Sequence, residues 1–187
     1  APKDWSGTTK PAMSFGQAYS VTAMQATSIF ATIANDGVRV EPTVIAGTSD
    51  AQGHYTPAKP RKSTRVISAE TATKMRLMME SVVSANGTAP SAAIPGYRIA
   101  GKTGTAQRVV NGRYSGYTAS FIGFAPADMP RYVISVTIQA PQGMHWGGVL
   151  GGPVFKEVMS YLLEAKHIPP TNTKVIPIPL NAAALAA

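Results

Sequence analysis

The stretch from Gly96 to Thr105 contains two overlapping motifs that imply different chemistry. Read from Gly96 to Thr103, it matches G-x-x-x-x-G-K-[ST], a loop whose backbone N–H groups and lysine bind nucleotide phosphates. Read from Lys102 to Thr105, it matches the Lys-Thr-Gly box of serine acyl-transfer enzymes. The first interpretation makes the protein a nucleotide hydrolase, and the second makes it an acyl-transfer enzyme.

The surrounding residues disfavour the phosphate loop. Such a loop needs a buried strand before it and a helix that opens at the lysine. The segment before Gly96 ends in Pro95, and a proline is a poor fit to a central strand. The would-be loop holds Tyr97, Arg98 and Ile99, which are side chains typical of a strand. Soon after Lys102 comes the turn pair Asn111-Gly112, which leaves too little room for an ordinary helix.

The same residues predict that the Lys-Thr-Gly box lies on the first strand of an antiparallel meander. Strands are expected over 97–110, 117–124 and 131–139, with turns between them. A glycine-rich connection at 147–152 then leads to a helix with Pro153 near its first turn. The fold class is therefore α/β in the broad sense, more narrowly α+β, with an antiparallel sheet packed against helices.

Two further helices are expected upstream of the box. The first begins at Thr22 with a capping-box spacing, buries apolar residues that include Ile29 and Phe30, and ends at Gly37. The second begins near Ser68 and carries a methionine-rich stripe that is typical of core packing. Residues 38–62 between these helices are expected to form a surface excursion of short extended segments.

Composition suits one compact domain or most of one, since 44% of the residues are hydrophobic and 14% are charged. The net charge of +8 and the basic cluster at 59–65 could indicate nucleic acid. No aromatic residue interleaves with that cluster, so we interpret it as a solvated loop and expect no nucleic-acid partner. Cysteine is absent, and His54, His145 and His167 are far apart in sequence, so neither a metal site nor a cofactor is expected.

Four sequence segments appear in one order along the chain: Phe15 to Gln25, Ala31 to Gly37, Gly101 to Gln107 and Gly151 to Phe155. Together they resemble the transpeptidase domain of class B penicillin-binding proteins, most closely the septal cell-division type, and their sequences are similar to those of actinobacterial members. The resemblance runs from about Ser14 to Lys166 and implies the fold of serine β-lactamases and transpeptidases, here as an incomplete domain.

The resemblance gives each residue of the box an expected role. Lys102 can favour the anionic end of a D-alanyl-D-alanine peptide or of a penicillin. Gly104 lacks a side chain where a substrate backbone would lie along the strand. The hydroxyls of Thr103 and Thr105 are candidates for binding the substrate carboxylate. By resemblance, the backbone N–H of Thr105 forms half of the oxyanion hole, so Lys102 and Thr105 are the expected catalytic residues.

The nucleophile of this family is missing from the sequence. The family uses a Ser-x-x-Lys pair and then a Ser-x-Asn box, both before Lys-Thr-Gly, and no Ser-x-x-Lys occurs here. Ser84-Ala85-Asn86 does match Ser-x-Asn, but it follows a helical stripe and precedes Gly87, so we interpret it as a helix end. The nucleophilic serine is therefore expected on a separate piece of polypeptide, and this chain alone is predicted to be inactive.

Met144, His145 and Trp146 precede a double glycine and are expected beside the end of the box strand. Family members commonly place aromatic residues there as a wall of the site, so Trp146 and His145 are expected to contact substrate. Histidine departs from the usual aromatic pair. The alternative for Trp146 is simple packing against Tyr114 or Tyr117.

The resemblance implies a peptidoglycan D,D-transpeptidase that cross-links stem peptides through a serine acyl-enzyme. Expected partners are the D-Ala-D-Ala stem peptide, β-lactam antibiotics, divisome proteins and the remaining N-terminal half of the same protein. Expected localisation is outside the cytoplasm, anchored to the membrane through a segment absent from this chain. A D,D-carboxypeptidase or β-lactam sensor of the same fold remains an alternative. Residues 1–168 are assigned to the transpeptidase domain and residues 169–187 to a Pro/Ala-rich tail.

Overall fold

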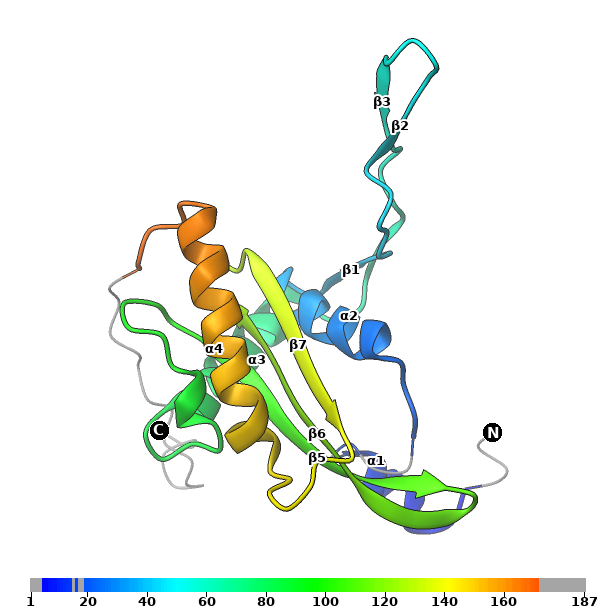
Figure 1. The fold of residues 1–187 in the computed structure, drawn as a ribbon, viewed down its shortest axis with the longest axis vertical. Helices are drawn as coiled ribbons and strands as arrows, with labels where there is room; N and C mark the ends of the chain where they lie inside the picture. Colours follow the sequence, from blue (N-terminus) through cyan, green and yellow to red (C-terminus); the bar gives the residue numbers. More distant parts are fainter. Residues whose placement is uncertain (1–4, 15, 17–18, 172–187) are drawn as a thin grey trace.

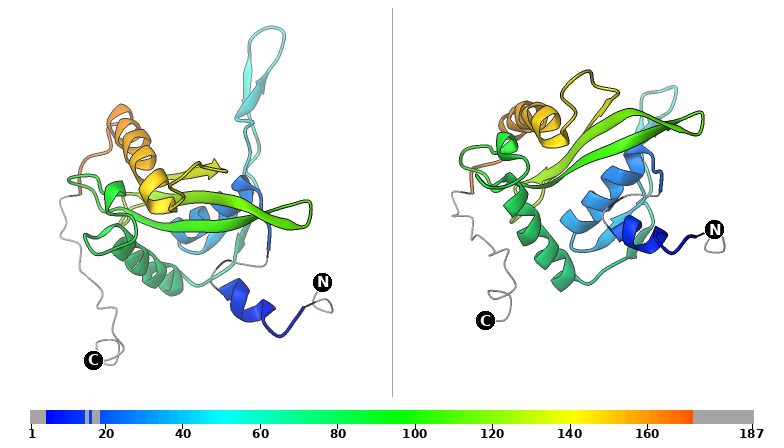
Figure 2. Two further views of the ribbon diagram at one scale, coloured as in Figure 1. Left: turned by 60° about the horizontal axis from the view of Figure 1, so that its bottom comes forward. Right: turned by 90° about the horizontal axis from the view of Figure 1, so that it is seen from below.

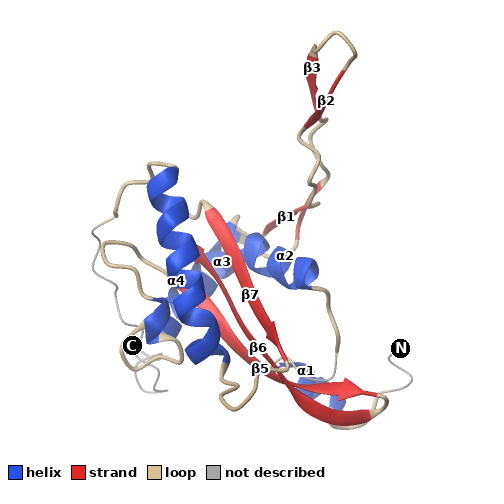
Figure 3. Ribbon diagram, in the orientation of Figure 1, coloured by secondary structure: helices blue, strands red, loops and turns tan. Residues whose placement is uncertain are grey.

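The computed structural model describes residues 5–14, 16 and 19–171. Two predicted features lie partly outside the described residues: most of the expected tail, and Phe15, Gln17 and Ala18 of the first family segment. Figures 1 and 3 show a sheet beside a long helix, with a thin arm that projects from the body. None of the helices in the described ranges combines the length and hydropathy that a membrane span requires.

The sheet is an antiparallel meander in the order β5-β6-β7. Its strands are β5 (Ala100–Val110), β6 (Arg113–Ala125) and β7 (Tyr132–Gln139). A tight turn at Asn111-Gly112, both with positive φ, joins β5 to β6. The predicted meander is confirmed, although β5 starts three residues later than expected because Gly96 and Tyr97 belong to a turn.

Helix α4 (Gly147–Ala165) covers one face of the sheet, and α2 (Ala23–Ala34) and α3 (Ala69–Glu80) cover the other. Figure 2 shows this layering from below, with the sheet between the two sets of helices. The prediction for the start of α4 is wrong: the glycine-rich run is not a connection but the first turns of the helix, so Pro153 lies inside α4.

The packing of α4 explains why these positions are glycine. A Cβ on Gly151 would lie 2.8 Å from the Phe121 Cβ, and one on Gly152 would lie 2.4 Å from the Ser91 Oγ. Both glycines are buried in the helix interface. Glycine is therefore needed at these two positions because it lets α4 pack closely against its neighbours, and not because the backbone must be flexible there.

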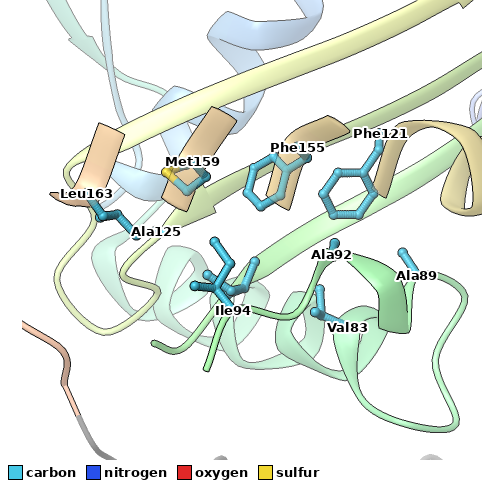
Figure 4. Close-up of a cluster of buried hydrophobic side chains, with 10 residues drawn as sticks. Val83, Ala89, Ala92, Ile94, Phe121, Ala125, Phe155, Met159 and Leu163 are labelled. Carbon is cyan, nitrogen blue, oxygen red and sulfur yellow. The ribbon is translucent and has the colours of Figure 1, made fainter. Parts of the chain in front are cut away.

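The main core lies between α4 and the sheet. Phe121 of β6 and Phe155 of α4 are fully buried and meet edge to face, with ring centroids 4.9 Å apart. Figure 4 shows this pair beside Met159 and Leu163, above the short segment that carries Ala92 and Ile94. This cluster fixes α4 on the sheet. A second cluster on the opposite face joins Met79 of α3 to Ala100 and Phe124.

A buried ion pair connects α3 to the entry of β5. Arg98 donates to both carboxylate oxygens of Glu80, from Nε at 2.8 Å and from Nη2 at 2.6 Å. The Glu80 side chain is only 3% exposed, and that of Arg98 is 15% exposed. These hydrogen bonds raise the pKa of Arg98 above its ordinary value. No local sequence pattern predicts this pair, whose members are 18 residues apart.

The predicted helix boundaries upstream are confirmed. Thr22 and Gln25 form the expected capping box at the start of α2. Gly37 follows the helix with φ +82°, and its N–H donates to Thr32 O. Ser68 caps α3 by accepting from the Thr71 N–H. The prediction that Ile29 is buried is wrong, because 50% of its surface is exposed.

The arm corresponds to the expected surface excursion. It consists of two short antiparallel pairs: β1 (Val38–Val40) with β4 (Ser63–Arg65), and β2 (Gly47–Ser49) with β3 (Tyr55–Pro57).

Two 3-10 turns, η2 (Ser81–Val83) and η3 (Pro90–Ala92), follow α3. A short helix, α1 (Thr9–Ser14), has no buried residue.

Candidate active site

The segment from Lys102 to Thr105 lies within β5, which is at the edge of the three-stranded sheet. Lys102 pairs with Ile122 of β6 and Thr105 with Ala119, so one side of β5 is bonded to β6. Because a strand runs through Lys102 and no helix opens there, the phosphate-loop alternative is wrong. The Lys-Thr-Gly interpretation fits this geometry, since its function needs a strand edge along which an extended peptide can lie.

Alternation along β5 puts the side chains of this segment on opposite faces of the sheet. Thr103 and Thr105 are on the α4 face, since Thr105 bonds to the first residue of α4. Lys102 is two residues beyond Ala100, which packs against Met79 of α3, so Lys102 is on the α2 and α3 face. Its Nζ donates to Thr103 O at 3.1 Å and is exposed.

The N-terminus of α4 meets β5 at Thr105. The Gly147 N–H donates to Thr105 Oγ1 at 3.1 Å. A Cβ on Gly147 would lie 2.2 Å from Gly104 O and 2.3 Å from Ser120 O, so only glycine allows this approach. A helix N-terminus carries partial positive charge, which favours an anion bound beside it. The two threonine hydroxyls are thus placed where a carboxylate would be stabilised.

Gly104 has a neighbour that the sequence did not suggest. A Cβ at this position would lie 2.5 Å from the Ser120 Oγ across the strand pair. The glycine therefore accommodates the Ser120 side chain on the sheet. Its role in leaving room for a substrate backbone stays a prediction.

A threonine outside the motif contacts it. The hydroxyl of Thr88 lies 3.1 Å from the hydroxyl of Thr103. Thr88 is in the turn between η2 and η3, and no motif in the sequence pointed to it as a site residue. A Cβ on Gly148 would lie 2.0 Å from Thr88 O and 3.0 Å from Thr103 Cγ2, so α4 closes over both residues.

The aromatic residues before α4 stand beside the same strand pair. His145 stacks on Tyr117, with ring centroids 4.1 Å apart and an interplanar angle of 9°. Tyr117 pairs with Gln107, two residues along β5 from Thr105. Trp146 is 57% exposed and meets His145 at a centroid distance of 5.0 Å. The packing partner of Tyr117 is thus His145, and the contact of either residue with substrate stays a prediction.

Ser84-Ala85-Asn86 lies in the turn after η2, as expected for a helix end. The hydroxyl of Ser84 donates to Ser81 O at 2.7 Å, a local bond typical of such ends. Among the residues that the structure describes, no group of three His, Asp or Glu could hold a metal ion.

An apolar hollow of about 600 Å³ lies away from β5, between α2, α3 and the root of the arm. Its lining includes Ile29 and Ile33 of α2, Val66, and Met75 of α3. It is on the face of the sheet toward which Lys102 points. This hollow does not include the Lys-Thr-Gly segment, and we attach no ligand to it.

Comparison with known families gives a match over most of the chain. Residues 1–160 match the family model described as the penicillin binding protein transpeptidase domain. Penicillin-binding protein PbpB of Mycolicibacterium smegmatis is 41% identical over 190 residues, which cover 95% of this chain and 29% of that protein. The probable peptidoglycan D,D-transpeptidase PenA of Neisseria flavescens is 37% identical over 94% of this chain and 43% of its own length.

Solved structures give the same result for the fold. The structure of penicillin-binding protein 3 of Mycobacterium tuberculosis with ampicillin superposes with a TM-score of 0.87 at 36% identity, over 97% of this chain and 43% of that one. Its aztreonam complex superposes with a TM-score of 0.82 over 91% of this chain. The predicted fold class and the likeness to actinobacterial relatives are confirmed. This chain spans less than half the length of these relatives, and it belongs to the penicillin-binding protein transpeptidase domain family.

Proposed function

We propose that this chain is the C-terminal part of a serine-type peptidoglycan D,D-transpeptidase. Its substrate is the D-Ala-D-Ala end of a stem peptide, and β-lactams occupy the same site. The observation that carries the proposal is the position of Lys102, Thr103 and Thr105 on an edge strand, with the first amide of α4 bonded to Thr105. Relatives that are themselves named penicillin-binding proteins and probable D,D-transpeptidases support it.

The chemistry follows from these positions. The Thr103 and Thr105 hydroxyls donate to the terminal carboxylate, and Lys102 adds positive charge on the other face of β5. The Thr105 N–H contributes half of an oxyanion hole, which stabilises charge as a serine hydroxyl attacks the penultimate carbonyl. D-alanine leaves, and the amine of a second stem peptide attacks the acyl-enzyme to form the cross-link. Water in place of that amine would give a carboxypeptidase.

The serine belongs to a part of the protein outside this chain. Apolar surface at Met24 and Ile29 of α2, and at Val154 and Val158 of α4, is 43–54% exposed, which suits contact with further polypeptide. The complete protein would work outside the cytoplasm on a membrane anchor, as a division-type enzyme with divisome partners.

Fluorescent penicillin labelling of the full-length protein tests this function. Wild type should be labelled, Lys102→Ala should be labelled at least tenfold more slowly, and the exposed control Lys156→Ala should behave as wild type. Mass spectrometry should place the adduct on a serine outside this chain. Failure of wild type to label, or an adduct within this chain, would refute the assignment.

A further inference from the structure

Thr88 is held beside the Lys-Thr-Gly segment by its own backbone neighbours. The Gly87 N–H donates to Ser84 O, and the Ala89 N–H donates to Val82 O, both at 2.9 Å. The carbonyl of Thr88 rests against Gly148, where a Cβ would lie 2.0 Å from it. Its hydroxyl is therefore presented to Thr103 Oγ1, 3.1 Å away, by a turn bonded on both sides.

The direction of this hydrogen bond follows from the chemistry of a bound carboxylate. A carboxylate only accepts hydrogen bonds, and a threonine hydroxyl has a single proton. If Thr103 gave that proton to Thr88, none would remain for the substrate. A charge-assisted bond to the carboxylate is the stronger one, so Thr103 donates outward and accepts from Thr88.

Thr105 has the same arrangement with a different donor. Its Oγ1 accepts from the Gly147 N–H at 3.1 Å, which leaves its own proton for the ligand. The Gly147 amide therefore donates to Thr105 in the structure, and the Thr88 hydroxyl, 3.1 Å from Thr103 Oγ1, is placed to donate to Thr103 in the same way when a carboxylate takes the Thr103 proton. Hydrogen bonds in such a chain polarise one another and strengthen the outer donor.

We propose that Thr88 is a positioning residue for recognition of the substrate carboxylate, acting through the hydroxyl of Thr103. This inference rests on the proposed function, in which Thr103 and Thr105 bind the terminal carboxylate of a stem peptide or β-lactam. Thr88 itself touches no substrate. Its effect is limited to ligands that carry the anionic group.

The test compares two probes on the full-length protein: benzylpenicillin, and its methyl ester, which lacks the carboxylate. Thr88→Val keeps the shape of the side chain and removes the hydroxyl. It should lower the second-order acylation rate with benzylpenicillin about tenfold, the effect of one lost hydrogen bond, and leave the rate with the ester within about twofold. Thr88→Ser should restore most of the rate with benzylpenicillin, and Thr56→Val on the arm serves as the control.

Each outcome decides the matter. Equal loss with both probes, no loss with Thr88→Val, or no rescue by Thr88→Ser would overturn the positioning role while wild-type labelling upholds the proposed function. Absence of wild-type labelling would overturn both. If thermal unfolding shows that Thr88→Val is not folded, Thr88→Ala takes its place in the same comparison.

Discussion

Replacing Gly147 by alanine should disturb the geometry of the site while the protein remains folded. The added Cβ would lie 2.2 Å from Gly104 O and 2.3 Å from Ser120 O. Both oxygens belong to the backbone of paired strands, so neither can rotate away as the end of a side chain can. The first turn of α4 must therefore move away from β5.

The size of the movement follows from these distances. Restoring a separation of 3.0 Å, below which Cβ contacts essentially do not occur, requires a displacement of about 0.8 Å from the present 2.2 Å. A displacement of that size away from the strand stretches the bond from the Gly147 N–H to Thr105 Oγ1, now 3.1 Å, beyond hydrogen-bonding range. Loss of one hydrogen bond and misplacement of a binding group should slow acylation by roughly ten- to a hundredfold.

The free energy of unfolding should change only modestly. Overpacking costs typically about 1–3 kcal/mol, and exchange of a helical glycine for alanine returns up to about 1 kcal/mol. The variant should thus remain folded, with a net loss of about 0–3 kcal/mol in the free energy of unfolding.

The assay is the rate of fluorescent penicillin labelling of the full-length protein, together with its thermal unfolding. Gly7→Ala is the matched control, since a Cβ there meets no atom within 4 Å. Labelling of Gly147→Ala at the wild-type rate would refute the argument that contact between α4 and β5 sets the position of Thr105. A rate loss that merely tracks unfolding would refute it as well.

Two further predictions concern the ion pair and the aromatic residues. Glu80→Gln should lower the free energy of unfolding by about 3 kcal/mol, because the Arg98 guanidinium, whose side chain is only 15% exposed, loses its carboxylate partner. Denaturant unfolding measures this loss, and a value below about 1 kcal/mol would show that water hydrates the guanidinium in place of Glu80. Trp146→Ala should slow β-lactam acylation about three- to tenfold, the range expected for loss of one aromatic contact, whereas unchanged kinetics would leave Trp146 as an exposed residue of α4's entry and not a wall of the site.

The sheet could be predicted from sequence because local signals agree there. Strand-forming side chains and the Asn111-Gly112 turn favour the same register, and β5 and β6 pair around that turn. Local signals could not predict that the glycine-rich run before Pro153 is helical. Glycine has poor helix propensity, so local reasoning predicts a connection, whereas contact with Phe121 and Ser120 makes glycine the residue that allows the helix to form there.

Side-chain pairs that meet only in the folded structure could not be predicted from local sequence patterns either. Nothing in the sequence connects Thr88 to Thr103, or Glu80 to Arg98, because each pair meets only when the turn and α3 pack on β5. Helical periodicity identified the apolar face of α2 but not what covers it. Ile29 is accordingly half-exposed in this chain, although its spacing predicts burial.

The position of the segment within one strand divides the proposed chemistry between two faces of the sheet. Thr103 and Thr105 share the α4 face with the core of Phe121 and Phe155, so the proposed anion-binding donors are supported by fully buried packing. Lys102 extends to the opposite face, where α2 and α3 leave an apolar hollow. Under the proposed function, the carboxylate-binding groups are thus held by the packing of this chain, whereas the attacking serine comes from a segment outside it.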